Sequence, residues 1–168
     1  MSIGFAAGEG EWRARLGTLR QVVRQEVVAR QLAECLADLP PRRVLDIGCG
    51  QGTQALLLAR RGHVVTGLDS SAQLLDDFRA ALAAEPAELG DRVRLVQGEA
   101  EAVTDLFAPS SFDVVLCQGV LMYFPDPGPL LDAIARVVVP GGTVSLLVRN
   151  GDALAMRPGL LEIGRAHV

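Results

Sequence analysis

The stretch from Asp46 to Gly52 joins one acidic side chain to glycines at positions 48, 50 and 52. Each glycine lets the backbone adopt a positive φ, or lets a ligand approach the main chain where a Cβ would block it. The stretch follows the strand-like run 43–45 and precedes a helix-like run over 53–61, whose first N–H groups are free donors. This combination predicts a loop that holds a nucleotide-like ligand.

The acidic residue at the start of this loop limits which ligands the loop can bind. The carboxylate of Asp46 would repel a nearby pyrophosphate and would favour a positive charge or sugar hydroxyls. Dinucleotide-binding loops have the spacing Gly-x-Gly-x-x-Gly, whereas here the third glycine comes one residue early and Thr53 takes its place. The loop therefore favours a cationic nucleoside ligand over a dinucleotide.

A second carboxylate, Asp69, follows the next apolar run along the chain, 64–68. A carboxylate at the end of that strand can accept hydrogen bonds from both hydroxyls of a ribose, which is the arrangement used for adenosine. This geometry serves any cofactor that contains adenosine. Asp69 therefore predicts nucleoside binding without choosing the cofactor.

Strand-like and helix-like segments alternate along the chain, which predicts an α/β fold with a parallel sheet covered by helices on both faces. Ligands of such sheets bind at the carboxyl ends of the strands. We expect a helix closed by Gly62, a helix capped by Ser70 or Ser71, and turns at 86–91 and 140–142. The expected strands are 43–47, 64–68, 93–97, 113–117 and 143–148, and the other expected helices are 19–36, 53–61 and 130–138.

The block from Val44 to Gly52 resembles motif I of the class I S-adenosylmethionine-dependent methyltransferases. The segments 98–102, 117–127 and 140–142 resemble later motifs of that family, in the same order. The resemblance implies a doubly wound, Rossmann-like, mostly parallel sheet of strand order 3-2-1-4-5, with S-adenosylmethionine as cofactor. The cofactor-binding residues that it implies in this core are Asp46, Gly48, Cys49, Gly50, Gly52, Asp69, Ser70, Ala100, Glu101 and Gln118.

The segments 16–25 and 149–157 resemble the bacterial methyltransferases that esterify 5-carboxymethoxyuridine in tRNA. That resemblance implies that Arg24 pairs with the carboxylate of the cofactor, as a planar guanidinium can. The acceptor is then a tRNA carboxylate or a small molecule. An NAD-dependent oxidoreductase and an inactive cofactor-binding fragment remain open as alternatives, and no residue is assigned to catalysis.

Composition indicates one domain of 168 residues, with 49% hydrophobic residues, a net charge of −4 and a mean hydropathy of +0.28. No apolar run approaches the roughly 20 residues of a membrane span, and the start lacks a signal-peptide pattern, so we expect a cytoplasmic protein without a membrane partner. The three cysteines, Cys35, Cys49 and Cys117, are widely spaced and fit neither a disulfide framework nor a metal site.

The ends of the chain set the expected domain bounds. We expect an N-terminal helical segment over 1–40, a cofactor-binding core over 41–150, and the start of a truncated C-terminal part over 151–161, lacking strands six and seven of the family. The peptide 162–168 matches the translation of a common sequencing adapter, which predicts a non-native tail. Without those strands the apolar side chains at 144, 146 and 148 lack a cover, so we expect self-association through strand 143–148, with an oligomeric state that is unknown.

Overall fold

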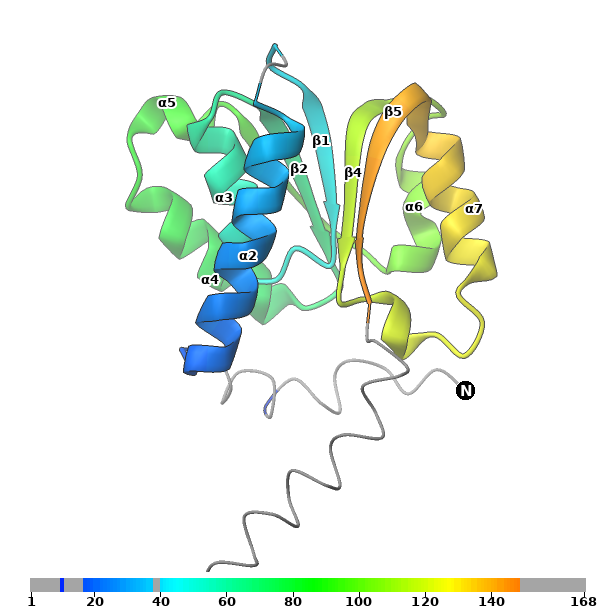
Figure 1. The fold of residues 1–168 in the computed structure, drawn as a ribbon, viewed down its shortest axis with the longest axis horizontal. Coiled ribbons are helices and arrows are strands. Elements are labelled where there is room, and N and C mark those ends of the chain that lie inside the picture. The colour runs from blue at the N-terminus through cyan, green and yellow to red at the C-terminus, as the bar shows by residue number, and fades with distance from the viewer. Residues whose placement is uncertain (1–9, 11–16, 38–39, 149–168) are drawn as a thin grey trace, which may run out of the picture.

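The computed structural model describes residues 10, 17–37 and 40–148. Five parallel strands form one sheet in the order β3-β2-β1-β4-β5, which confirms the expected doubly wound α/β arrangement (Figure 1). The strands are β1 (Arg43–Ile47), β2 (Val64–Asp69), β3 (Val93–Gln97), β4 (Phe112–Gln118) and β5 (Val138–Leu147). The helical elements are α2 (Leu19–Cys35), α3 (Thr53–Arg60), α4 (Ala72–Ala83), α5 (Ala87–Gly90), η2 (Ala100–Ala102), α6 (Val103–Leu106), η3 (Leu121–Tyr123) and α7 (Gly128–Val137).

Alternation along the strands divides the core into two layers. Val44 on β1 packs with α2, α3, α4 and α5, whereas its neighbour Leu45 packs with α6 and α7 on the other face (Figure 1). Because side chains of a strand alternate between faces, Asp46 lies on the same face as Val44, toward α2 and α3. The same alternation on β4 places Gln118 on the face of Val114 and Leu116.

Two long-range contacts hold the amino ends of the strands. The side chain of Asp113 on β4 accepts hydrogen bonds from the backbone N–H and the guanidinium of Arg43, with Nη2 2.9 Å from Oδ1. His63 is buried, and its Nδ1 accepts a hydrogen bond of 3.1 Å from the backbone N–H of Arg42. Desolvation and the nearby Arg61 and Arg42 lower the pKa of His63, so this imidazole is a neutral structural group at the edge of the sheet opposite the glycine loop.

Several expected boundaries differ from the structure. The strand expected at 143–148 begins earlier, at Val138, directly after α7, and the turn expected at 140–142 is an irregularity within β5 where its register against β4 shifts. Gly141 there has φ +75°, and a Cβ on Gly142 would lie 2.8 Å from the carbonyl oxygen of Asp113. The turn expected at 86–91 contains the short helix α5, and α7 begins at Gly128 and ends at Val137 instead of spanning 130–138.

Other expectations fall wholly or partly outside the described residues. These include the truncated C-terminal part 151–161, the tail 162–168 and the resemblance carried by 149–157. Of the expected N-terminal segment 1–40, the structure describes α2, which packs on α3 through Val28, Leu32 and Leu36. Among the described helices, none combines the length and the apolar character that crossing a membrane requires.

Candidate functional site

The carboxyl ends of β1, β2 and β4 bring three of the expected side chains to one edge of the sheet. In the register of the sheet, Asp46 on β1 lies opposite Gly67 of β2 and Leu116 of β4. Asp69 and Gln118 are the last residues of β2 and β4. The strand-end rule therefore predicted correctly which residues share this edge.

Backbone hydrogen bonds fix the glycine loop between β1 and α3. The N–H groups of Gly48 and Cys49 both donate to the carbonyl oxygen of Leu68, at 2.8 and 3.1 Å. The N–H of Gly50 donates to Oδ2 of Asp69 at 2.8 Å, and the N–H of Gly52 donates to the carbonyl oxygen of Cys49 at 3.0 Å. The end of β2 thus holds the loop from Gly48 to Gly50, and the loop closes on itself at Gly52.

The three loop glycines have positive φ values of 69°, 55° and 84° at positions 48, 50 and 52. A Cβ on Gly48 would overlap the side chain of Val120, and a Cβ on Gly52 would overlap the ring of Phe78. The protein's own packing and backbone conformation therefore require glycine at these two positions, with or without a ligand.

Two buried carboxyl groups lie close enough to repel each other at the base of the loop. Asp46 is 4% exposed, and desolvation, followed by repulsion from Asp69, raises the pKa of Asp46 to about 7. Asp69 is also buried, and its Oδ1 and Oδ2 accept hydrogen bonds from the backbone N–H groups of Ser71 and Gly50. Such a pair favours a positive charge or hydrogen-bond donors at its open side.

A cavity of about 80 Å³ lies between the glycine loop and α2. Its polar lining includes Arg24 of α2, Asp46, Gln118 and Gln54, together with the loop backbone. Arg24 forms no ion pair with another described residue, and its Nη2 lies 3.3 Å from the position of a Cβ built on Gly119. Gln118 donates from Nε2 to the Ser145 hydroxyl at 3.3 Å. The cavity has room for a small polar group of a ligand.

Gln54 and Gln25 of this cavity were not among the expected site residues. Gln54 lies in the first turn of α3, just after the last loop glycine, and Gln25 follows Arg24 on α2. The sequence could have indicated Gln54, because a polar side chain two residues past Gly52 has to lie near the loop. The sequence could not have indicated Gln25, because its backbone carbonyl makes the contact and every residue type has one.

Of the remaining expected residues, Cys49 lines the cavity, whereas Asp69, Ser70, Ala100 and Glu101 lie outside its lining. Cys49 is buried within the loop, and burial raises the pKa of its thiol strongly. Ser70 follows Asp69, and the cap of α4 is Ser71, whose hydroxyl accepts a hydrogen bond from Leu74 N–H. Ala100 and the exposed Glu101 form η2 after β3, next to the end of β2 where Gly98 N–H donates to the Asp69 carbonyl.

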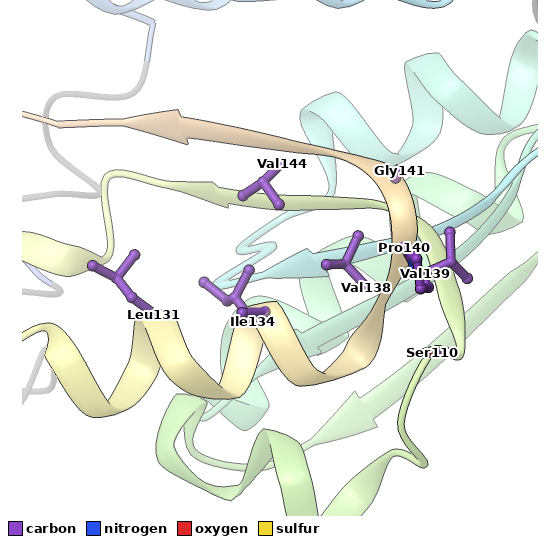
Figure 2. A pocket seen from close by; sticks show the side chains of 10 residues that line it. Ser110, Leu131, Ile134, Val138, Val139, Pro140, Gly141 and Val144 are labelled. Carbon is purple, nitrogen blue, oxygen red and sulfur yellow. The ribbon is translucent and has the colours of Figure 1, made fainter.

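A larger hollow, of about 510 Å³, lies between α7 and β5 and shares no lining residue with this cavity (Figure 2). Figure 2 shows Leu131 and Ile134 of α7 on one side and Val144 of β5 on the other. No residue of its lining carries an ionisable side chain, so the hollow offers no group for polar chemistry. We therefore place the candidate site at the smaller cavity, where the charged and amide groups meet.

Metal and disulfide chemistry find no support in the described residues. They contain no group of three or more His, Cys, Asp or Glu side chains arranged to hold a metal ion. All three cysteines are free thiols, with Cys49 and Cys117 buried and Cys35 exposed.

Comparison with known proteins agrees with this architecture. A family profile described as "Methyltransferase domain" matches residues 45–146. The chain is 35% identical to the tRNA 5-carboxymethoxyuridine methyltransferase of Escherichia coli (strain K12) over 142 residues, which cover 83% of this chain and 53% of the relative. It is 40% identical to the ubiquinone biosynthesis O-methyltransferase of Paracidovorax citrulli over 121 residues, covering 71% and 49%.

A solved structure is similar in fold as well as in sequence. The glycopeptide N-methyltransferase MtfA complexed with sinefungin superposes with a TM-score of 0.64 at 28% identity, covering 75% of this chain and 55% of that one. The chain spans about half the length of the curated relatives it matches.

Proposed function

The chain belongs to the S-adenosylmethionine-dependent methyltransferase family, and we propose that it binds this cofactor at the glycine loop and transfers its methyl group to an oxygen of an acceptor. The observation that carries the proposal is the cavity beside the loop, where Arg24, Asp46 and Gln118 come together from three separate elements. A cation, an acid and amides in one small cavity suit the zwitterionic amino-acid end of the cofactor.

The donors and acceptors of the site fit the groups of the cofactor one by one. The guanidinium of Arg24 suits the carboxylate, and the buried carboxyl of Asp46 suits the positive charges of the ammonium and the sulfonium. Asp69 stands at the end of β2 in the position that adenosine-binding sheets use for the ribose hydroxyls. We propose that the segment with Ala100 and Glu101 contacts the adenine, and that Ser70 lies beside the ribose.

When bound, the cofactor would supply an electrophilic methyl carbon on its sulfonium. A nucleophile would form a bond to this carbon in line with the breaking carbon–sulfur bond, and S-adenosylhomocysteine would be the leaving group. The residues of this chain contribute binding and alignment. Arg24 and the loop hold the amino-acid end, while Asp69 holds the loop. Proximity and orientation of this kind account for much of the rate enhancement in such transfers.

The acceptor that we favour is a carboxylate, as in a 5-carboxymethoxyuridine of tRNA. A carboxylate is already ionised at neutral pH and needs no general base. Among the described residues, the only histidine is His63, which lies at the opposite edge of the sheet, and the chain contains no lysine. A small-molecule hydroxyl is the second candidate, because one of the similar relatives is named as an O-methyltransferase of ubiquinone biosynthesis.

The first test is calorimetric titration of the purified chain with S-adenosylhomocysteine and, separately, with NAD. The proposal expects saturable binding of S-adenosylhomocysteine and none of NAD, whereas the reverse result would identify an oxidoreductase. The second test offers methyl-labelled S-adenosylmethionine with tRNA containing 5-carboxymethoxyuridine or with a polyphenol. Label in the tRNA supports the carboxylate acceptor, label in the polyphenol supports the hydroxyl, and binding without any transfer identifies an inactive cofactor-binding fragment.

A further inference from the structure

Gln54 has a buried acceptor that the described protein leaves unsatisfied. The residue is 9% exposed, and its Nε2 donates to the backbone carbonyl oxygen of Gln25 at 3.1 Å. Its Oε1 has no hydrogen-bond partner in the described part of the chain. Since a buried polar atom without a partner is costly and uncommon, Oε1 calls for a donor from outside the protein.

The orientation of this amide follows from its neighbour. A backbone carbonyl can only accept, so the NH₂ group of Gln54 must face Gln25, and a flipped amide would place two oxygens against each other. The side chain lines the cavity beside the glycine loop, together with Arg24, Asp46 and Gln118. With Nε2 committed to α2, Oε1 is the polar atom of Gln54 that is left for a ligand.

The charged groups around this oxygen indicate the chemistry of the missing donor. Arg24 lies one residue before Gln25, on the helix that Gln54 holds, and supplies the positive side of the cavity. Asp46 supplies the negative side. A ligand group that donates to an amide oxygen next to a carboxyl group, while its own carboxylate meets Arg24, is the α-ammonium of an amino acid.

We propose that Oε1 of Gln54 accepts a hydrogen bond from the α-ammonium of the cofactor, while Nε2 of the same amide holds α2 so that Arg24 reaches the α-carboxylate. This proposal rests on the proposed function and assigns a binding residue to it. One side chain then couples the recognition of the two charged groups at the amino-acid end.

The test compares ligands within each variant, which cancels general effects on folding. The probes are S-adenosylhomocysteine, its deamino analogue and its decarboxylated analogue, titrated by calorimetry. In Gln54→Leu the preference for S-adenosylhomocysteine over the deamino analogue should fall about tenfold or more, since a hydrogen bond to a charged group is lost. Gln54→Glu keeps an acceptor oxygen but loses the donor to Gln25, and should retain that preference.

The matched control is Gln73→Leu, the same change on the exposed face of α4, which should leave all three affinities unchanged. If Gln54 acts only by holding α2, Gln54→Leu will reduce the preference for S-adenosylhomocysteine over the decarboxylated analogue and leave the preference over the deamino analogue unchanged. That result overturns the proposal. An unchanged ammonium preference in Gln54→Leu overturns it as well. If Gln54→Leu does not fold by circular dichroism, Gln54→Met gives the same comparison.

Failure of the inference and failure of the proposed function are separable. If the unmodified chain does not bind S-adenosylhomocysteine, the proposed function fails. If it binds and the ammonium preference does not depend on Gln54, only the assignment of Gln54 fails.

Discussion

Asp69 accepts a 2.8 Å hydrogen bond from the backbone N–H of Gly50, which ties the end of β2 to the middle of the glycine loop. Its other oxygen accepts from Ser71 N–H at 2.9 Å, at the entrance to α4. One carboxylate therefore shapes both the loop before it and the helix after it. This supporting role comes in addition to the ribose contact that we propose, and it gives the residue an effect on stability that ligand binding alone would not produce.

Replacing this carboxylate should cost stability before any ligand is added. In Asp69→Ala the N–H groups of Gly50 and Ser71 lose their buried acceptors, so we expect a loss of about 1–3 kcal/mol in the free energy of unfolding. Urea denaturation measures this, and calorimetry should show weaker S-adenosylhomocysteine binding. Asp105→Ala, at an exposed position of α6, is the control. Equal stability of the Asp69 variant and the unmodified chain would contradict the supporting role.

The sequence allowed the strand ends to be predicted but not every side chain beside them. Asp46 and Asp69 were placed correctly because each lies at or next to the end of an apolar run, and parallel strands end at one edge. Gln54 was overlooked although it lies two residues past Gly52, and its hydrogen bond could not be predicted because the acceptor is a backbone carbonyl 29 positions away. The early start of β5 was missed because Pro140 and the glycines after it signal a turn, whereas the backbone accommodates them as an irregularity within the strand.

The buried carboxyl of Asp46 should make stability fall with rising pH. Its pKa of about 7 lies above the value of about 4 in an unfolded chain, so the folded state holds the extra proton between these values. This contribution is fully present below about pH 4 and is lost as the pH rises through about 7. Asp46→Asn should remove this dependence and gain stability relative to the unmodified chain, on the order of a few kcal/mol near pH 8.

The measurement is urea unfolding of both proteins across this pH range, with the difference between them as the readout. His63 has a lowered pKa and acts in the opposite direction, losing stability as the pH falls, but it is present in both proteins and cancels. A difference that stays constant with pH would contradict the raised pKa. Because a cationic ligand favours the ionised form, S-adenosylhomocysteine binding should tighten toward pH 8 in the unmodified chain only.

Two glycines with similar backbone conformations allow the cost of backbone strain to be distinguished from the cost of steric overlap. Gly52 has φ +84° and Gly62 has φ +95°, so alanine is strained at both. A Cβ at position 62 meets nothing within 4 Å, whereas at position 52 it overlaps the buried ring of Phe78. Gly62→Ala should therefore cost about 1–2 kcal/mol, and Gly52→Ala several kcal/mol more or fail to fold. Thermal unfolding compares them, and equal costs would contradict the packing account.

The three thiols should differ sharply in reactivity. Cys35 is exposed, whereas burial raises the pKa of Cys117 to about 12 and shifts that of Cys49 in the same direction. Because the thiolate is the reactive form, a thiol reagent at pH 8 should label one cysteine in the native chain and three after denaturation. Cys35→Ser should abolish native labelling. Rapid native labelling of Cys49 would show that the glycine loop opens on the timescale of the reaction.

The edge of β5 that β4 does not pair with should promote association between copies of the chain. In the described residues β5 pairs with β4 alone, and Val144 and Leu146 are 40% and 44% exposed on it. An exposed edge strand with apolar side chains is a template for pairing with another chain. We expect concentration-dependent oligomers in sedimentation velocity, and we expect the double variant Val144→Glu, Leu146→Glu to shift them toward the monomer, because like charges oppose edge-to-edge contact. The control is Val64→Glu, at a position that is 50% exposed at the start of β2, and it should leave the distribution unchanged. An unmodified chain that stays monomeric at high concentration would contradict the prediction.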